Sequence, residues 1–154
     1  MQARVMHKQR LYLAGPLFSE AEKKFNQVLK ELLSRHFAVY LPQEDGDLLV
    51  ELIAKGMAPD QAALRVFNHD VEEIGKCDVF LIILDGRAVD EGAAMELGLA
   101  YAANKKCYGL RTDPRQLLAT GHNPMIACAL TKTFCSIKEL EKWADAQFQE
   151  HASR

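Results

Sequence analysis

The chain has 154 residues and a formal net charge of −2, with 49% apolar and 26% charged residues. This balance is ordinary for a folded soluble protein and excludes a disordered or collagen-like chain. At this length we expect one globular domain that covers residues 1–154. Because no block of Lys and Arg is large enough to displace many counterions, we expect no nucleic-acid partner.

The first ten residues, MQARVMHKQR, are polar and basic, and no apolar stretch of signal-peptide length follows them. No segment approaches the ~18 consecutive apolar residues of a transmembrane helix. We therefore expect a cytoplasmic protein that does not enter a membrane. The four cysteines are widely spaced without a C-x-x-C pair, so we expect reduced thiols buried in the core: Cys77, Cys107, Cys128 and Cys135.

Strand and helix patterns alternate along the chain. Short apolar runs predict strands at residues 11–14, 37–41, 79–84, 107–110 and 133–135, the last one weak and at a sheet edge. Helical patterns follow at residues 48–55, 60–76 and 91–104, and S-x-x-E capping boxes at Ser19 and Ser136 begin two more helices. The segment QEDGD after Pro42 reads as a polar turn.

This alternation predicts a parallel sheet with helices on both faces, and the uninterrupted run Val79–Leu84 is typical of its central strand. Ligands of such sheets bind beyond the carboxyl ends of the strands, at the switch point in strand order. The residues that follow the first and third strands are therefore candidates for a site: Tyr12, Gly15, Pro16, Phe18 and residues 85–91.

Glu96 is the most unusual residue, because every other residue from Gly92 to Ala103 is apolar or Tyr. A carboxylate in such surroundings is costly unless it is paired or used. The alternative is an exposed Glu on a partly buried helix.

Other candidates also have ordinary explanations. Asp90 stands where it would cap the helix that carries Glu96, although it could also accept hydrogen bonds from sugar hydroxyls. Asp70 has Glu72 and Glu73 beside it, as on a solvated helix face. Tyr12 alone would be an ordinary strand aromatic, and Asn123 an ordinary turn residue before a proline.

Together, four segments resemble the nucleoside 2-deoxyribosyltransferases, in order and with compatible spacing over residues 10–145. They are LYLAGPLF at Leu11–Phe18, NHD at Asn68–Asp70, DEGAAMELG at Asp90–Gly98 and HNPM at His122–Met125. The resemblance implies a flavodoxin-like or Rossmann-like α/β fold with a five-stranded parallel sheet. It further implies a salvage enzyme without cofactor or metal, whose substrates are a 2-deoxyribonucleoside and a free nucleobase.

The resemblance also assigns roles. Glu96 attacks the anomeric carbon, Tyr12 holds Glu96 by a hydrogen bond, and Asp70 contacts the base and helps protonate it as it leaves. A carboxylate nucleophile divides one displacement into two through a covalent intermediate, so configuration is retained and water or a second base can accept the sugar. The two carboxyl groups need separated pKa values.

The substrate-binding residues implied by the resemblance are Asp90 for the deoxyribose hydroxyls, Phe18 for stacking on the base, and Gln43, a looser match, for the base; Gly15 lies in the same first turn. Asn123 matches an Asn that a neighbouring subunit lends to the sugar, and Met125 accompanies it. The resemblance therefore implies a homo-oligomer whose sites are completed by a neighbour.

Two other functions stay open. A related branch hydrolyses deoxynucleoside monophosphates and needs a phosphate site, for which Arg87 and Ser19 are the nearby candidates. Asp90 would repel phosphate, so we favour a nucleoside. The chain could also be a nucleoside- or nucleotide-sensing module on the same fold. Some family members place their chain end near the site, whereas this chain has no aromatic residue after Phe148.

Overall fold

The computed structural model describes residues 8–115 and 122–152. The first seven residues and the last two lie outside this range. The expectations about a leader segment and about the chain end depend partly on these residues. Five strands form one sheet: β1 (Arg10–Ala14), β2 (Ala38–Tyr40), β3 (Val79–Ile83), β4 (Lys106–Leu110) and β5 (Lys132–Phe134). The helices are α1 (Glu20–Leu33), α2 (Pro42–Asp45), α3 (Leu49–Ala54), α4 (Pro59–Lys76), α5 (Glu91–Ala102), α6 (Pro124–Ala127) and α7 (Ile137–Ala152).

All neighbouring strands pair in parallel, in the order β2-β1-β3-β4-β5. This confirms the five-stranded parallel sheet and its flavodoxin-like strand order. The central strand β3 is buried along its whole length, as its continuous apolar run predicts. The switch point in strand order therefore lies between β1 and β3.

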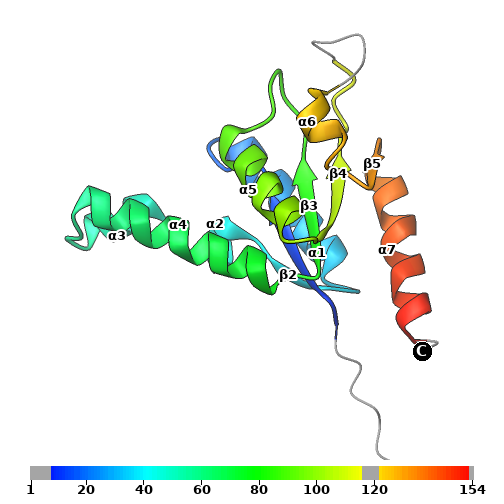
Figure 1. Ribbon diagram of the computed structural model, residues 1–154, viewed down its shortest axis with the longest axis horizontal. Coiled ribbons are helices and arrows are strands. Elements are labelled where there is room, and N and C mark those ends of the chain that lie inside the picture. The colour runs from blue at the N-terminus through cyan, green and yellow to red at the C-terminus, as the bar shows by residue number, and fades with distance from the viewer. Residues whose placement is uncertain (1–7, 116–121, 153–154) are drawn as a thin grey trace, which may run out of the picture.

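Side chains alternate between two hydrophobic layers. On one face of the sheet, Leu11, Leu13 and their neighbours pack against α1 and α7. On the other face, Tyr12, Ala14 and their neighbours pack against α4 and α5. Figure 1 shows these helices around the sheet, with α3 and the first half of α4 projecting away from it. No helix within the described ranges is long and apolar enough to cross a bilayer.

Local signals set the helix starts that matter for the site. Ser19 and Glu22 form the expected capping box at α1, in which the Ser19 side chain accepts a hydrogen bond from the Glu22 N–H. Asp90 caps α5 by accepting a hydrogen bond from the Ala93 N–H at 2.9 Å. These caps fix both helices that begin beside the carboxyl ends of β1 and β3.

Two expectations were wrong in detail. Part of the segment QEDGD is helical, because Pro42 begins the short helix α2 and the Asp45 carboxylate accepts a hydrogen bond from the Leu41 N–H. Only Cys77 and Cys107 are buried thiols, whereas Cys128 and Cys135 are exposed. Cys128 ends the short helix α6, and Cys135 directly follows β5. An apolar run at such surface positions does not guarantee burial.

Candidate active site

A hydrogen bond joins β1 to α5 across 84 residues of sequence. The Tyr12 hydroxyl donates to Glu96 Oε1 at 2.8 Å. The Tyr12 ring is fully buried and lies between two other rings, 5.2 Å from Tyr40 and 5.4 Å from Phe80. Because stacking fixes the ring, the position of the hydroxyl is set before any ligand binds.

Burial controls the ionisation of Glu96. Desolvation raises its pKa to about 7, and the nearby charges of Asp70 and Asp90 add to this, while the Tyr12 hydrogen bond opposes it. The side chain of Glu96 is half-buried, so the alternative of an exposed Glu is wrong. A carboxyl group with a pKa near 7 is ionised in a substantial fraction of molecules at neutral pH, as a nucleophile requires.

Asp70 lies on α4 and faces the same buried region. Burial raises its pKa, whereas the charge of His69 and the hydroxyls of Tyr12 and Tyr40 lower it. Burial also raises the pKa of Tyr12, with further increases from Glu96 and Asp70. Tyr12 therefore stays a proton donor at physiological pH, and the structure directs its proton to Glu96.

Glu96 opens into a small pocket of about 150 Å³ at the carboxyl end of β1. The lining side chains that carry charge are both carboxylates, and the others are apolar or glycine: Gly15, Leu17, Phe18, Pro42, Asp90, Gly92, Ala93 and Glu96. This pocket is smaller than the ~300 Å³ at the lower end of common small-molecule sites. The described residues around Glu96 therefore enclose less volume than a common small-molecule site does.

Asp90 has spare hydrogen-bonding capacity. Its Oδ2 caps α5, whereas no hydrogen bond among the described residues uses Oδ1. A Cβ at position 92 would lie 3.2 Å from Asp90 Oδ2, so Gly92 leaves room for this cap. The carboxylate can cap the helix and accept a ligand hydroxyl at the same time.

The turn after β1 supplies the opposite wall. A Cβ at Gly15 would lie only 2.9 Å from Ile83 Cδ1, so the turn packs closely on β3 because position 15 is glycine. Phe18 lines the pocket with 76% of its surface exposed. A large exposed ring at a pocket rim is available for stacking on a ligand.

The remaining predicted residues lie apart from this pocket. The Gln43 amide donates to the Lys23 carbonyl and accepts from the Asn26 amide at 2.8 Å, so it is directed toward α1. Asn123 caps α6 through the Met125 N–H, and Met125 is 82% exposed. Figure 1 shows α6 beyond the carboxyl end of β4. The substrate-binding roles of all three residues stay predictions.

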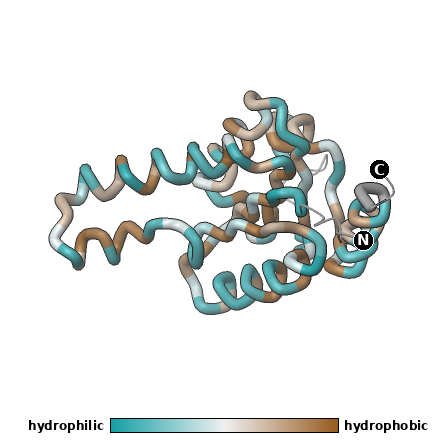
Figure 2. Tube along the Cα trace, turned by 90° about the horizontal axis from the view of Figure 1, so that it is seen from below, coloured by the Kyte–Doolittle hydropathy of each residue, from teal (hydrophilic) through white to brown (hydrophobic). Residues whose placement is uncertain are grey.

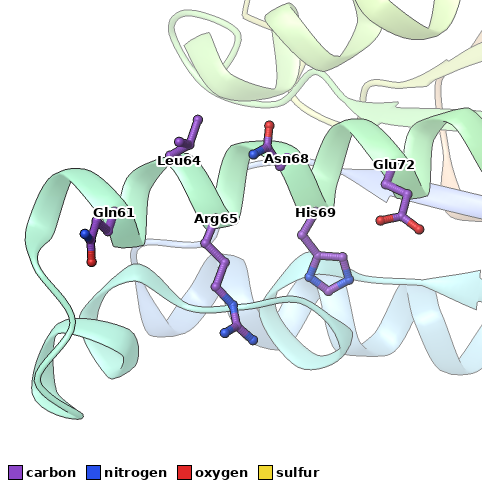
Figure 3. Close-up of a pocket in the computed structure, with 6 residues that line it drawn as sticks. All are labelled: Gln61, Leu64, Arg65, Asn68, His69 and Glu72. Atoms are coloured by element: carbon purple, nitrogen blue, oxygen red, sulfur yellow. The ribbon is translucent and has the colours of Figure 1, made fainter.

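A larger open hollow of about 440 Å³ runs along α4, next to Asp70 in sequence. Figure 3 shows Arg65 and His69 pointing to one side of this helix and Leu64 and Asn68 to the other. Arg65 binds both carboxylate oxygens of Asp47, and His69 Nδ1 lies 3.3 Å from Asp47 Oδ2. The Arg65 guanidinium at this hollow is therefore already engaged by the Asp47 carboxylate, and His69 lies against the same group.

Sequence reasoning missed three residues at the site. Tyr40 stacks on Tyr12 because the two occupy paired positions of β1 and β2. Pro42 and Leu17 line the Glu96 pocket. The sequence predicts a strand that contains Tyr40, but only the order of the strands in the sheet shows that Tyr40 lies beside Tyr12.

Several solved structures and one curated relative are similar to this chain. A conserved protein from Enterococcus faecalis V583 superposes with a TM-score of 0.76 at 26% identity, covering 91% of this chain and 99% of its own. A 2-deoxyribosyltransferase from Bacillus psychrosaccharolyticus superposes with a TM-score of 0.71 at 25% identity, covering 86% and 90%. An uncharacterized protein of Ureaplasma parvum is 30% identical over 118 residues, 69% of this chain and 72% of that protein.

The sequence model of one family covers almost the whole chain. It describes the nucleoside 2-deoxyribosyltransferases and matches residues 11–150, a span that holds Tyr12 of β1 and the whole of α5 with Glu96. On this match, and on the shared fold, the chain belongs to the nucleoside 2-deoxyribosyltransferase family.

Proposed function

We propose that this protein transfers a 2-deoxyribosyl group between nucleobases through a covalent glycosyl-Glu96 intermediate, with hydrolysis as a side reaction. Membership of the family supports an enzyme that acts on N-glycosidic bonds. The observation that carries the proposal is the Glu96 carboxylate, held by the Tyr12 hydroxyl at 2.8 Å and opening into a pocket beside Asp90.

The first step forms one bond and breaks another. Tyr12 engages Glu96 Oε1, which leaves Oε2 to attack the anomeric carbon of the deoxyribose. The glycosidic C–N bond breaks, its electron pair goes to the base nitrogen, and neutral Asp70 gives the base a proton. The burial that raises the pKa of Asp70 favours this neutral form.

The second step reverses the roles. A nitrogen of a second base attacks the anomeric carbon from the face that the first base left, and it returns a proton to Asp70. The ester bond to Glu96 breaks, and the carboxylate regains the Tyr12 hydrogen bond. Two inversions give net retention, and water in place of the second base gives hydrolysis.

Asp90 is the group we assign to the deoxyribose hydroxyl, because its Oδ1 is unused within the described structure while Oδ2 holds the helix cap. A buried acceptor that pairs with a hydroxyl discriminates strongly against ligands without one. The same carboxylate repels a phosphate, and the other charged residue of the pocket, Glu96, does so too. We therefore favour free nucleosides over their 5′-monophosphates.

We further propose a homo-oligomer in which a neighbouring subunit lends Asn123 and Met125 to the site. Two observations support this: the pocket of one chain is small, and α3 with α4 exposes large apolar side chains. Figure 2 shows hydrophobic stretches along the projecting α3 segment. Apolar surface of this kind is typical of protein contacts. The exposed residues are Leu49, Val50, Ile53, Leu64, Phe67 and Val71.

The test is to incubate the protein with deoxyinosine and adenine and to separate the products. We expect deoxyadenosine and hypoxanthine, with some free deoxyribose. Base release from deoxyinosine 5′-monophosphate but not from deoxyinosine would instead identify a nucleotide hydrolase. Binding of these compounds without any product would favour a sensing module.

A further inference from the structure

Asn26 is a polar residue on the buried face of α1. It shares this face with Leu29 and Leu33, and only 2% of its surface is exposed. A leucine here would continue the apolar stripe, whereas a buried amide costs free energy unless its groups are hydrogen-bonded. The amide at this position therefore needs a reason other than the packing of α1 on the sheet.

The side-chain nitrogen of Asn26 makes two hydrogen bonds. It donates to the Pro16 carbonyl at 2.9 Å, in the turn after β1, and to Gln43 Oε1 at 2.8 Å, on α2. Gln43 Nε2 in turn donates to the Lys23 carbonyl at 3.0 Å. Because backbone carbonyls only accept hydrogen bonds, the two ends of this chain of bonds fix the orientation of both amides.

The two segments that Asn26 joins are the turn at residues 15–18 and the helix α2, and both line the Glu96 pocket. Among the described residues, no direct hydrogen bond links the turn to α2, so Asn26 supplies the polar connection between these two wall segments. The pocket residues that belong to the wall segments are Gly15, Leu17, Phe18 and Pro42.

The other half of the Asn26 amide is left unused. Its Oδ1 is buried and has no hydrogen-bond partner among the described residues. An unpaired buried oxygen lowers stability, and an apolar side chain would avoid this cost. The two donated hydrogen bonds are therefore what an asparagine supplies at this position.

We propose that Asn26 is a positioning residue that joins the two wall segments of the Glu96 pocket and thereby holds the acceptor base during the second displacement. This inference rests on the proposed function, in which a base and water compete for the glycosyl-Glu96 intermediate. The base must lie against the walls to align with the anomeric carbon, whereas water needs no such support. A shift of the turn also moves Phe18, the ring that we expect to stack on the base.

The experiment measures how the intermediate divides between its two acceptors. In a reaction of deoxyinosine with adenine at a fixed concentration, the deoxyadenosine formed is compared with the free deoxyribose. Asn26→Leu keeps the buried bulk without the two donors, and its ratio of transfer to hydrolysis should fall at least ~5-fold. Loss of folded protein would lower both products together and leave the ratio unchanged. Asn26→Ala should show the same fall, and an unchanged ratio in these variants would overturn the proposal.

Lys30→Gln is the matched control. Lys30 lies one turn further along α1 and binds the same helix α2 through Glu44 and Asp45, at 2.9 and 2.7 Å, and these ion pairs do not involve the turn after β1. Its ratio of transfer to hydrolysis should change less than ~2-fold. A fall as large as that in Asn26→Leu would mean that any loosening of α2 has this effect, which would overturn the specific role of Asn26.

Gln43→Leu breaks the same chain of hydrogen bonds at its other amide. It should lower the ratio as Asn26→Leu does, and the double variant should lose little more than either single variant, because each change already separates the two wall segments. Effects that add in free energy would mean that the two side chains act independently, which contradicts a single connection through Asn26.

A second readout does not depend on activity. Amide hydrogen exchange reports the wall segments separately, because the Phe18 N–H is hydrogen-bonded in the turn and the Gly46 N–H closes α2. Relative to the amides of β3, both should exchange at least ~5-fold faster in Asn26→Leu, whereas Lys30→Gln should leave the Phe18 amide unchanged. Unchanged exchange in Asn26→Leu would overturn the connection whatever the enzyme does with nucleosides.

The two readouts also separate this inference from the proposed function. A parent protein that forms neither deoxyadenosine nor free deoxyribose would overturn the proposed function, and the role of Asn26 in holding a base would be overturned with it. Faster exchange in Asn26→Leu would still support the connection between the wall segments. An active parent whose ratio is unaffected in Asn26→Leu would overturn the inference alone.

Discussion

Two groups of proposed site residues differ in how completely one chain places them. The partly buried cluster of Tyr12, Tyr40, Asp70 and Glu96 is tied together by stacking, hydrogen bonding and mutual charge. Among the described residues, the exposed group of Phe18, Asn123 and Met125 makes no hydrogen bond with Glu96. The side chains of Phe18 and Met125 are 76% and 82% exposed. One chain therefore fixes the first group of proposed residues through contacts, whereas it leaves the second group exposed.

The largest expected effect comes from removing the proposed nucleophile from the partly buried cluster. Glu96→Ala should fold and lose transfer by at least ~100-fold, because no other carboxylate lines the pocket except Asp90. Glu96→Gln should behave likewise, since it keeps the shape without the charge. Steady-state assays with deoxyinosine and adenine measure both, and near-parental turnover in either variant is incompatible with the mechanism.

Asn123 tests the exposed group. Asn123→Ala should lose activity about 10-fold or more if its amide reaches the sugar of a neighbouring site, and mixing it with Glu96→Ala subunits that can exchange should restore part of the activity. Asn123→Ser is the control, because serine also caps a helix such as α6. Full activity in Asn123→Ser would limit Asn123 to capping, and an active, strictly monomeric protein in sedimentation would refute shared sites.

Asp90 joins the two groups, since it caps α5 and faces the pocket. The kcat/KM for deoxyadenosine should exceed that for its 5′-monophosphate by at least ~10-fold, because a carboxylate repels phosphate. Adenosine should also be a poor substrate, on the family resemblance. Asp90→Ser keeps a capping side chain and should move the preference toward the monophosphate. Equal or better use of the monophosphate by the parent would favour the nucleotide hydrolase.

The smallest expected effect is on stability. Burial raises the pKa of folded Glu96 to about 7 from 4.5. The stabilising contribution of its neutral form is therefore complete below pH ~4.5, and it is lost as the pH rises through 7. At pH 8 the buried charge costs on the order of 1–3 kcal/mol. Glu96→Gln should consequently melt about 3 °C or more above the parent at pH 8, and the gap should close toward pH 4.5.

The matched control for this stability effect is Glu31→Gln, which removes an exposed carboxylate from α1. Its melting temperature relative to the parent should vary little between pH 4.5 and pH 8. Calorimetry at several pH values makes the comparison. A Glu96→Gln gap that does not change with pH would mean that Glu96 is not held in a desolvated site.

Sequence alone determined the features that depend on near neighbours in the chain. The run Val79–Leu84 predicts a strand that is covered on both faces, and β3 is buried throughout. Ser19 with Glu22, and Asp90 with Ala93, form the expected caps because each hydrogen bond spans only three residues. The alternation of strand and helix patterns was likewise sufficient to predict the parallel sheet and the edge where the candidate site lies.

Only the tertiary structure decided which side chains meet. Tyr12 reaches Glu96 across 84 residues, and Tyr40 reaches Tyr12 because β2 happens to lie beside β1 in the sheet order. The inward hydrogen bonds of Gln43 and the exposure of Cys128 could not be read from their neighbours either. Such contacts depend on strand order and on which helix covers which face, and the free energy of packing sets both over the whole chain rather than within any one segment.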